Sequence, residues 1–408
     1  MKNQFKIIPM SKKVAGDCKI DCDTGCVISM TAKPDSYSIT RASAVVGDIT
    51  GGMVYDIKIP YRAALVSGCK VQVIASWVME NGDTYSRGYL VIASDDLMTL
   101  RYHTHESVVS LELEYRFCSH GGGSVIFYMP QISCIGEYQP RYVRFATAWI
   151  KPQDNNTAAD NVIEMHRIID NAGTSGEKPD MIVFTETVYG CNVYSLTTEE
   201  RALKIDSPEV TDICAKAAKY RMYIIVGLYI NDAGLIKNVA LVINRNGEIQ
   251  HIYQKTHLPM YEAGEGVVPG SEIPVFDLDF GTIGILICWD QFFSETSRIL
   301  HKKGAEIIVI PTAGDTEIQS RARALDSGAY VIVSGTHQSS SSMIIDPHGD
   351  IIATISDIEK GYTDVEVDLN KRFCTYWISV GPCYGEERDV FLNERRSDLY
   401  KDLTDNIS

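Results

Sequence analysis

The hydrophobic pattern of this chain changes near residue 140, and this change constrains the fold more than any other feature. Before it, short runs alternate apolar and polar residues with a period of two, which is typical of strands with one buried face. These runs cover residues 54–59, 70–77, 89–92, 108–115 and 124–128, and Asn81-Gly82 provides a hairpin turn. We therefore expect residues 1–140 to form an all-β sandwich of the jelly-roll kind.

After residue 140, strand-like and helix-like patterns alternate. Apolar residues recur at helical spacing over 158–169, and Ser207 followed by Pro208 is typical of a helix start. Strand-like runs cover residues 144–149, 181–184, 222–228, 240–243, 249–253, 306–310, 330–333, 342–345, 351–355 and 364–368. This alternation predicts a layered α/β domain over residues 141–408.

Length, charge and cysteine content narrow the class of protein. At 408 residues with 45% hydrophobic content, the chain exceeds what one core usually covers, so two domains are expected. A net charge of −15 argues against nucleic acid or an anionic membrane as a partner, because both attract basic surfaces. The eleven scattered cysteines fit a reducing compartment, and no run approaches a membrane span. We expect a soluble, cytoplasmic protein.

Residues 281–295 read GTIGILICWDQFFSE, and their apolar part predicts a buried strand that ends at Cys288. A helix should follow, with Ser294 as its N-cap and Gly304 after its last turn. A thiol on a strand-to-helix turn points outward near backbone N–H groups, which suits a nucleophile. Taken alone, such a cysteine is more often a packing residue. Glu186 and Lys255 also end strand-like runs, where α/β sheets bind ligands, and this favours chemistry at Cys288.

Two groups of residues in the first 140 could be read as metal ligands. Neither has the spacing of a common zinc or cluster motif, and chance or an exposed polar edge explains both better. The two groups are Cys18, Cys22 and Cys26, and His103, His105, Cys118 and His120. We therefore expect no metal site.

Three motifs carry a resemblance to a known family: FTET at 184–187, YQKTHLP at 253–259 and ICWDQFFSE at 287–295. From about residue 142 onward, the chain resembles the nitrilase, or carbon–nitrogen hydrolase, superfamily. Further matching segments are KGAE at 303–306, RARA at 321–324, IDPHGD at 345–350 and RRSDLY at 395–400. The resemblance implies a nitrilase-like α-β-β-α sandwich, no cofactor, and a homo-oligomer that is a dimer or larger.

The resemblance also implies a role for each site residue. Cys288 would be the nucleophile and Glu186 its base, because a thiol with a pKa near 8.5 is mostly protonated at neutral pH. Lys255 would stabilise the anionic intermediate together with the backbone N–H of Trp289. Glu262 resembles the second glutamate of the family, which orients substrate and lysine. Glu265 is a competing candidate for that position.

These roles indicate a hydrolase that cleaves an amide or N-carbamoyl compound through a cysteine thioester and releases ammonia. The cysteine segment is most similar to that of N-carbamoyl-amide hydrolases, so the expected partner is a small-molecule substrate. Two alternatives remain open: an acyltransferase that uses the same thioester, and a binding or scaffold protein on the same fold. The first 140 residues loosely resemble carbohydrate-binding β-sandwiches, so a carbohydrate or a protein is considered as their ligand.

Overall fold

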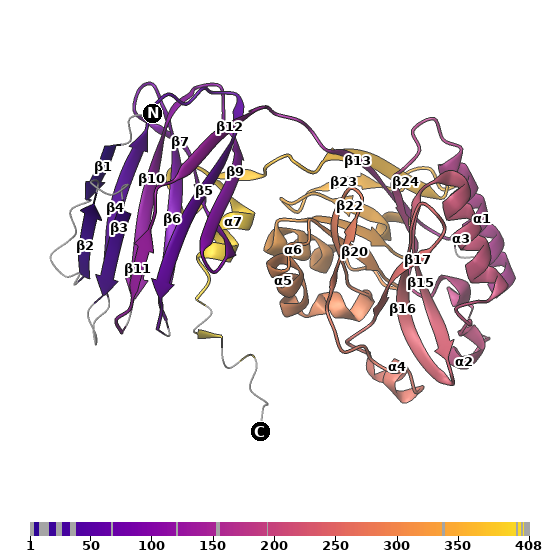
Figure 1. The fold of residues 1–408 in the computed structure, drawn as a ribbon. Coiled ribbons are helices and arrows are strands. Elements are labelled where there is room, and N and C mark those ends of the chain that lie inside the picture. Colours follow the sequence, from indigo (N-terminus) through magenta and orange to yellow (C-terminus); the bar gives the residue numbers. More distant parts are fainter. Residues whose placement is uncertain are drawn as a thin grey trace. The chain divides into compact units, whose positions relative to one another are not determined.

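The computed structural model describes residues 4–7, 16–21, 27–32, 38–66, 68–119, 121–151, 156–193, 195–336, 339–396, 399–400 and 403. The chain divides into two compact units (Figure 1). Unit 1 comprises Met1–Gln139 and Arg372–Ser408, and unit 2 comprises Pro140–Lys371. Cys22, Cys26 and His120 lie outside the described residues.

Unit 1 is a sandwich of two sheets. The first contains, in spatial order, β1 (Gln4–Ile7), β4 (Ser38–Val46), β10 (Val108–Ser119), β6 (Lys70–Met79), β7 (Thr84–Tyr89), β26 (Gly381–Glu386) and β25 (Cys374–Trp377). The second contains β2 (Gly16–Asp21), β3 (Val27–Ala32), β11 (Ser124–Phe127), β5 (Met53–Ala64), β9 (Leu97–His103) and β8 (Val91–Ser94), and β12 (Gln131–Glu137) also pairs with β5. Buried rings join the sheets, because Trp77 of β6 stacks on Tyr102 of β9 with centroids 4.9 Å apart. The expected all-β sandwich is confirmed.

One expected strand of unit 1 is divided between the two sheets. The period-two run at 89–92 predicts a single strand, but β7 ends at Tyr89 and β8 begins at Val91. Leu90 between them is buried, and its N–H donates to the carbonyl of Val73 at 2.9 Å. The chain therefore crosses from one sheet to the other at Leu90, a step that the alternating pattern does not reveal.

The last part of the chain completes unit 1 and does not belong to the α/β unit. β26 pairs in parallel with β7, and α7 (Glu387–Asn393) follows it. Arg87 Nη1 donates to the carbonyl of Val380 at 2.7 Å. A small apolar core also joins this segment to the sandwich: Ile74, Tyr89, Val380, Cys383 and Val390. The expected second domain ran to residue 408, whereas the observed unit 2 ends at Lys371.

Unit 2 has two six-stranded sheets. The first contains, in spatial order, β17 (Ile249–Gln254), β16 (Leu235–Ile243), β15 (Tyr223–Asp232), β14 (Met181–Val183), β13 (Tyr142–Ala148) and β24 (Tyr362–Asp368). The second contains β18 (Val275–Leu278), β19 (Gly281–Ile285), β20 (Ile307–Pro311), β21 (Tyr330–Ser334), β22 (Met343–Ile345) and β23 (Ile351–Thr354). The sheets lie against each other, since Thr147 Oγ1 of β13 donates to the carbonyl of Val333 of β21 at 2.5 Å.

Helices cover the outer faces of both sheets of unit 2 (Figure 1). α1 (Ala158–Gly173) and α3 (Pro208–Tyr220) pack on the first sheet, and α5 (Ser294–Lys302) and α6 (Glu317–Ser327) pack on the second. Shorter helical segments are η1 (Val188–Gly190), α2 (Thr198–Arg201), α4 (Met260–Gly264), η2 (Cys288–Phe292) and η3 (Ser339–Ser341). The α-β-β-α sandwich is confirmed. In the described part of the chain, no helix combines the length and apolarity needed to cross a bilayer.

Helix ends follow the sequence signals in most cases. α3 begins after Ser207, whose hydroxyl accepts from the N–H of Val210, with Pro208 in the first turn as expected. Gly304 follows α5 with φ +94°, a left-handed conformation that glycine adopts easily. The expectation that Ser294 is an N-cap is wrong, because Ser294 is the first residue of α5 and Phe293 precedes it. The chain after Cys288 first forms the short helix η2 and so delays the start of α5.

The docking of α7 on the sandwich can be tested with a valine pair. Val390 in α7 is 4% exposed, and Val45 in β4 is 44% exposed. Val390→Ala is expected to lower the free energy of unfolding of unit 1 by about 1–3 kcal/mol, because it removes two buried methyl groups. Val45→Ala should change it by less than about 0.5 kcal/mol. Urea unfolding, followed by hydrogen exchange in β26 and α7, measures the free energy of unfolding of both variants. An equal loss in Val390→Ala and Val45→Ala would contradict the packing of α7 described above.

Candidate active site

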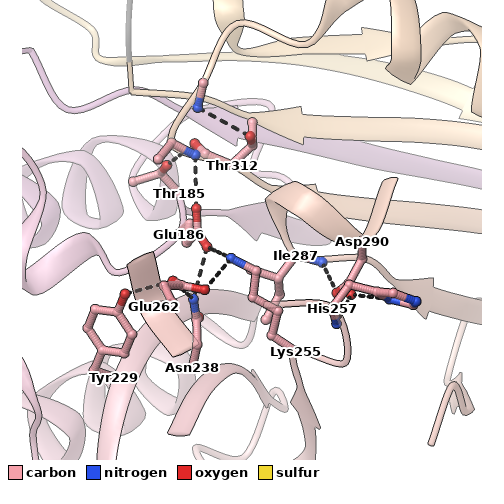
Figure 2. Close-up of polar contacts among 12 residues, drawn as sticks. Thr185, Glu186, Tyr229, Asn238, Lys255, His257, Glu262, Ile287, Asp290 and Thr312 are labelled. Atoms are coloured by element: carbon pink, nitrogen blue, oxygen red, sulfur yellow. Dashed lines mark hydrogen bonds and ion pairs between the residues drawn. The ribbon is translucent and has the colours of Figure 1, made fainter. Parts of the chain in front are cut away.

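Three strand ends of unit 2 carry the charged and reactive side chains of the site, and Figure 2 shows two of these, Glu186 and Lys255, in contact. Glu186 follows β14, Lys255 follows β17 directly, and Cys288 follows β19. The first two come from one sheet and the third from the other. The loop that carries Glu186 lies so close to β15 that a Cβ at Gly227 would be 2.7 Å from the Glu186 Cα. A glycine is needed at position 227 for this approach.

A buried ion cluster forms the centre of the site. Lys255 has no exposed surface, and its Nζ donates to Glu186 Oε1 at 2.7 Å and to Glu262 Oε2 at 2.8 Å. Burial opposes the charged form of Lys255, but the two carboxylates outweigh it and raise the pKa of Lys255 above its ordinary value. The lysine therefore remains cationic at neutral pH. It holds a fixed positive charge between two acids from different segments of the chain.

Glu262 and Glu265, the two candidates for the second glutamate, lie in different environments. Glu262 is in α4, is fully buried, and contacts Lys255. Glu265 follows α4, is exposed, and accepts a hydrogen bond from Thr198. Only Glu262 has a hydrogen bond to the ion cluster among the described contacts of these two residues. The geometry therefore favours Glu262 for the position that the resemblance left open.

Neutral donors that we did not anticipate complete the cluster. Asn238 Nδ2 lies 2.9 Å from Glu186 Oε1 and 2.9 Å from Glu262 Oε1. The Tyr229 hydroxyl donates to Glu262 Oε1 at 2.7 Å, and the N–H of Ala313 donates to Glu186 Oε2 at 3.2 Å. In the sequence, Asn238 is a polar residue next to an apolar strand-like run. This pattern alone does not indicate where its side chain points.

Cys288 lies on a sharp turn of the chain. Its φ is +45°, a left-handed conformation that costs a non-glycine residue about 1–3 kcal/mol and is common at functional sites. Burial and the negative charge of Glu186 raise the pKa of the partly buried thiol to about 12. Lys255 and hydrogen bonds from the Thr312 side chain and Ala313 backbone act in the opposite direction. The thiol is thus protonated at neutral pH and needs a base before it can attack.

Asp290 holds this turn in place. Its buried carboxylate accepts from the N–H of Ile287 at 2.9 Å (Figure 2). The same oxygen accepts from the Tyr253 hydroxyl at 2.9 Å. Its other oxygen accepts from Thr256 Oγ1 at 2.9 Å and from the N–H of His257 at 2.8 Å. Ile287 precedes the nucleophile candidate and Thr256 follows Lys255. Asp290 therefore ties the two strand ends together.

The remaining predicted site residue, Trp289, follows Cys288 in η2. Its side chain is 38% exposed, and its ring lies 4.7 Å from the ring of Phe292. Among the described residues, no group of three or more His, Cys, Asp or Glu side chains is arranged as a metal site. The arrangement around Cys288 supplies a thiol, a carboxylate that can exchange a proton, and a fixed ammonium group. These are the components of nucleophilic catalysis with acid–base assistance.

Comparison with known proteins points in the same direction. A sequence model of the carbon-nitrogen hydrolase family matches residues 145–372, more than half of the chain. A probable nitrilase from Schizosaccharomyces pombe is 27% identical over 262 residues, covering 60% of this chain and 92% of the relative. A citrullinase from Francisella tularensis is 31% identical over 172 residues, covering 40% of this chain and 59% of the relative. An omega-amidase from Homo sapiens is 25% identical over 251 residues, covering 56% of this chain and 90% of the relative.

Solved structures share the fold. A carbon-nitrogen hydrolase from Helicobacter pylori G27 superposes with a TM-score of 0.53 at 20% identity, covering 65% of this chain and 99% of the other. An amidase from Nesterenkonia sp. gives a TM-score of 0.51 at 18% identity, covering 65% of this chain and 98% of the amidase. At these identities the likeness concerns the backbone arrangement of the α-β-β-α sandwich.

The raised pKa of Cys288 predicts how the thiol titrates. An ultraviolet difference titration of the wild type against Cys288→Ser should show no thiolate step near the ordinary thiol value of about 8.5. The reason is that burial and Glu186 disfavour the thiolate, so the proton is lost only near pH 12. A step at or below pH 8.5 would contradict this and would indicate a thiolate in the resting protein.

The role of Asp290 in holding the turn predicts a loss of stability on substitution. Asp290→Ala removes the acceptor of the four donors named above and the partner of His257 Nδ1 at 3.0 Å, and several of these groups would then be buried without a partner. The expected cost is at least about 2 kcal/mol in the free energy of unfolding of unit 2, measured by urea unfolding. Glu295→Gln is a suitable control because Glu295 is exposed and accepts only from Ser294 in the described contacts. Equal stability of the two variants would argue against the role.

Proposed function

Because this chain belongs to the carbon–nitrogen hydrolase family, we propose that it hydrolyses an amide or N-carbamoyl compound through a thioester on Cys288. The family makes it a hydrolase of C–N bonds in a small molecule; the substrate class and the thioester are the proposal. The observation that supports it most is the buried cluster of Glu186, Lys255 and Glu262 beside a thiol on a left-handed turn. A protonated thiol next to a carboxylate is the starting state that such a reaction needs.

The first half of the reaction forms the thioester. Glu186 takes the proton from the Cys288 thiol as sulfur adds to the substrate carbonyl carbon. The carbonyl oxygen becomes an anion, and the Lys255 ammonium with the backbone N–H of Trp289 stabilises it. Two hydrogens of Lys255 are directed to the glutamates, which leaves one for the oxyanion. The C–N bond then breaks, and Glu186 returns its proton to the departing ammonia.

The second half releases the acid. Water enters where ammonia left, and Glu186 removes a proton from it as it attacks the thioester carbonyl. The same ammonium and backbone donors stabilise the second tetrahedral anion. The carbon–sulfur bond breaks, and the thiolate recovers its proton from Glu186. One carboxylate thus serves both steps, so it must remain fixed and must alternate between ionised and protonated forms.

Two features guide the choice of substrates. The relatives include one named citrullinase and one named omega-amidase, so ureido and amide compounds are tested first. The cluster of two carboxylates and one ammonium carries a net negative charge beside the thiol. A neutral carboxamide or ureido group suits this site better than an anionic group at the reacting carbon. Glu262, with Lys255, would orient that group.

Ammonia release across N-carbamoyl compounds, ω-amides, amino-acid amides and nitriles tests the proposal. The wild type is expected to release ammonia from amides or N-carbamoyl compounds, and Cys288→Ala to lower kcat by at least about 10³-fold. Glu186→Gln and Lys255→Ala should cause comparable losses, because each removes a group used in both steps. Mass spectrometry of a quenched reaction should show an acyl group on Cys288.

The exposed thiol of Cys134 provides the matched control. Cys134→Ala should retain wild-type activity, which separates the effect of Cys288 from a general effect of removing a cysteine. Wild-type turnover in Cys288→Ala would overturn the mechanism. A folded wild-type protein that is silent across the panel would overturn the proposed activity. In that case, transfer of the acyl group to added hydroxylamine would indicate an acyltransferase, and its absence a binding protein.

A further inference from the structure

One neutral side chain contacts both acids of the ion cluster. Asn238 lies in β16 and is fully buried. Its Nδ2 has two hydrogens, and it lies 2.9 Å from an oxygen of Glu186 and 2.9 Å from an oxygen of Glu262 (Figure 2). Apart from Lys255, it is the one side chain in the described structure with hydrogen bonds to both carboxylates. Both donor positions of the amide are therefore used on the site.

The main chain of the same residue holds the lysine. The carbonyl of Asn238 accepts from the N–H of Lys255 at 2.9 Å, at the end of the pairing between β16 and β17. Asn238 also lies directly opposite Tyr229 in the pairing of β15 with β16, and both side chains donate to Glu262. One residue thus contacts the lysine through its backbone and both glutamates through its side chain. Its position fixes their mutual arrangement.

The orientation of this amide follows from the charges around it. Asn238 Oδ1 is buried and has no hydrogen-bond partner among the residues that the structure describes. A buried acceptor without a partner costs about 1–3 kcal/mol, yet rotating the amide would place this oxygen against two carboxylates. The favourable contacts of Nδ2 with the two acids outweigh that cost. The amide is held in place for its two donors.

The charge balance of the cluster shows what those donors accomplish. Two carboxylates share a buried space with one ammonium, and carboxylates that lie close together repel each other. Lys255 compensates one negative charge, and neutral donors must stabilise the rest. Tyr229 donates to Glu262 alone, whereas Asn238 donates to Glu186 as well. Asn238 is a neutral side chain that holds the carboxylate of the proposed base in place.

We propose that Asn238 is a positioning residue of the reaction, which holds the Glu186 carboxylate aligned beside Lys255 by donating to both glutamates. This inference rests on the proposed function, in which Glu186 must accept the thiol proton. It predicts that a side chain of the same shape without the two N–H donors would impair proton transfer more than substrate binding.

The experiment compares Asn238→Leu with Tyr229→Phe. Leucine is close to asparagine in size, has no side-chain donor and adds no charge, whereas Tyr229→Phe removes a donor to Glu262 only. Asn238→Leu is expected to lower kcat by at least about 10²-fold with a KM change below about threefold. Tyr229→Phe should lower kcat less than about tenfold.

Neither variant changes the formal charge of the cluster, so a loss of kcat seen only in Asn238→Leu belongs to the amide at position 238. A wild-type kcat in Asn238→Leu would overturn the inference, as would an equal loss of kcat in Tyr229→Phe.

Two further measurements keep the test decisive. If Asn238→Leu does not fold, Asn238→Ser, which retains one donor, should lower kcat by at least about tenfold with little change in KM, and an unchanged kcat would overturn the inference. Alkylation of Cys288 by iodoacetamide at neutral pH, followed by mass spectrometry, needs no turnover and should be slower in Asn238→Leu than in Tyr229→Phe. A wild type that is silent on the substrate panel refutes the proposed function, and equal alkylation rates refute the role of Asn238.

Discussion

The contact between the buried Lys255 ammonium and two glutamates is the interaction on which the rest of the site depends. An ammonium group with no exposed surface is stable only if opposite charges lie beside it. Glu186 and Glu262 supply those charges at 2.7 and 2.8 Å, and they come from segments far apart in the sequence. Loss of either partner would leave an uncompensated charge in the interior. The same contact therefore stabilises the fold locally and fixes the positions of the groups available for chemistry.

The two facing sheets of unit 2 explain how such a cluster arises. Glu186 and Lys255 are at strand ends of one sheet, and Cys288 is at a strand end of the other. Asp290 then joins the cysteine turn to the segment after Lys255 through hydrogen bonds on both of its oxygens. The carboxylate, the ammonium and the thiol are in this way attached to the ends of strands.

The sequence predicted those parts of the fold and site that depend on local patterns. Periods of two and of 3.6 indicate strands and helices directly, and Ser207-Pro208 located the start of α3 because capping is a local interaction. Asn238 and Tyr229 were missed, because a polar residue in a strand reveals its role only when its partners from other segments are known. The docking of residues 372–396 on the sandwich was missed for a similar reason. Its strands are short, and their partner β7 lies almost 300 positions earlier in the chain.

The return of the C-terminal segment to the sandwich has a consequence for synthesis on the ribosome. The strands of unit 1 up to β12 emerge first, but β26, β25 and α7 leave the ribosome only after all of unit 2. Until then, the outer edge of β7 has no partner, and the apolar side chains of Ile74 and Tyr89 lack their cover. Unit 2 can therefore mature while unit 1 is still incomplete. The order of folding in the cell would then run opposite to the order in which the two units begin along the chain.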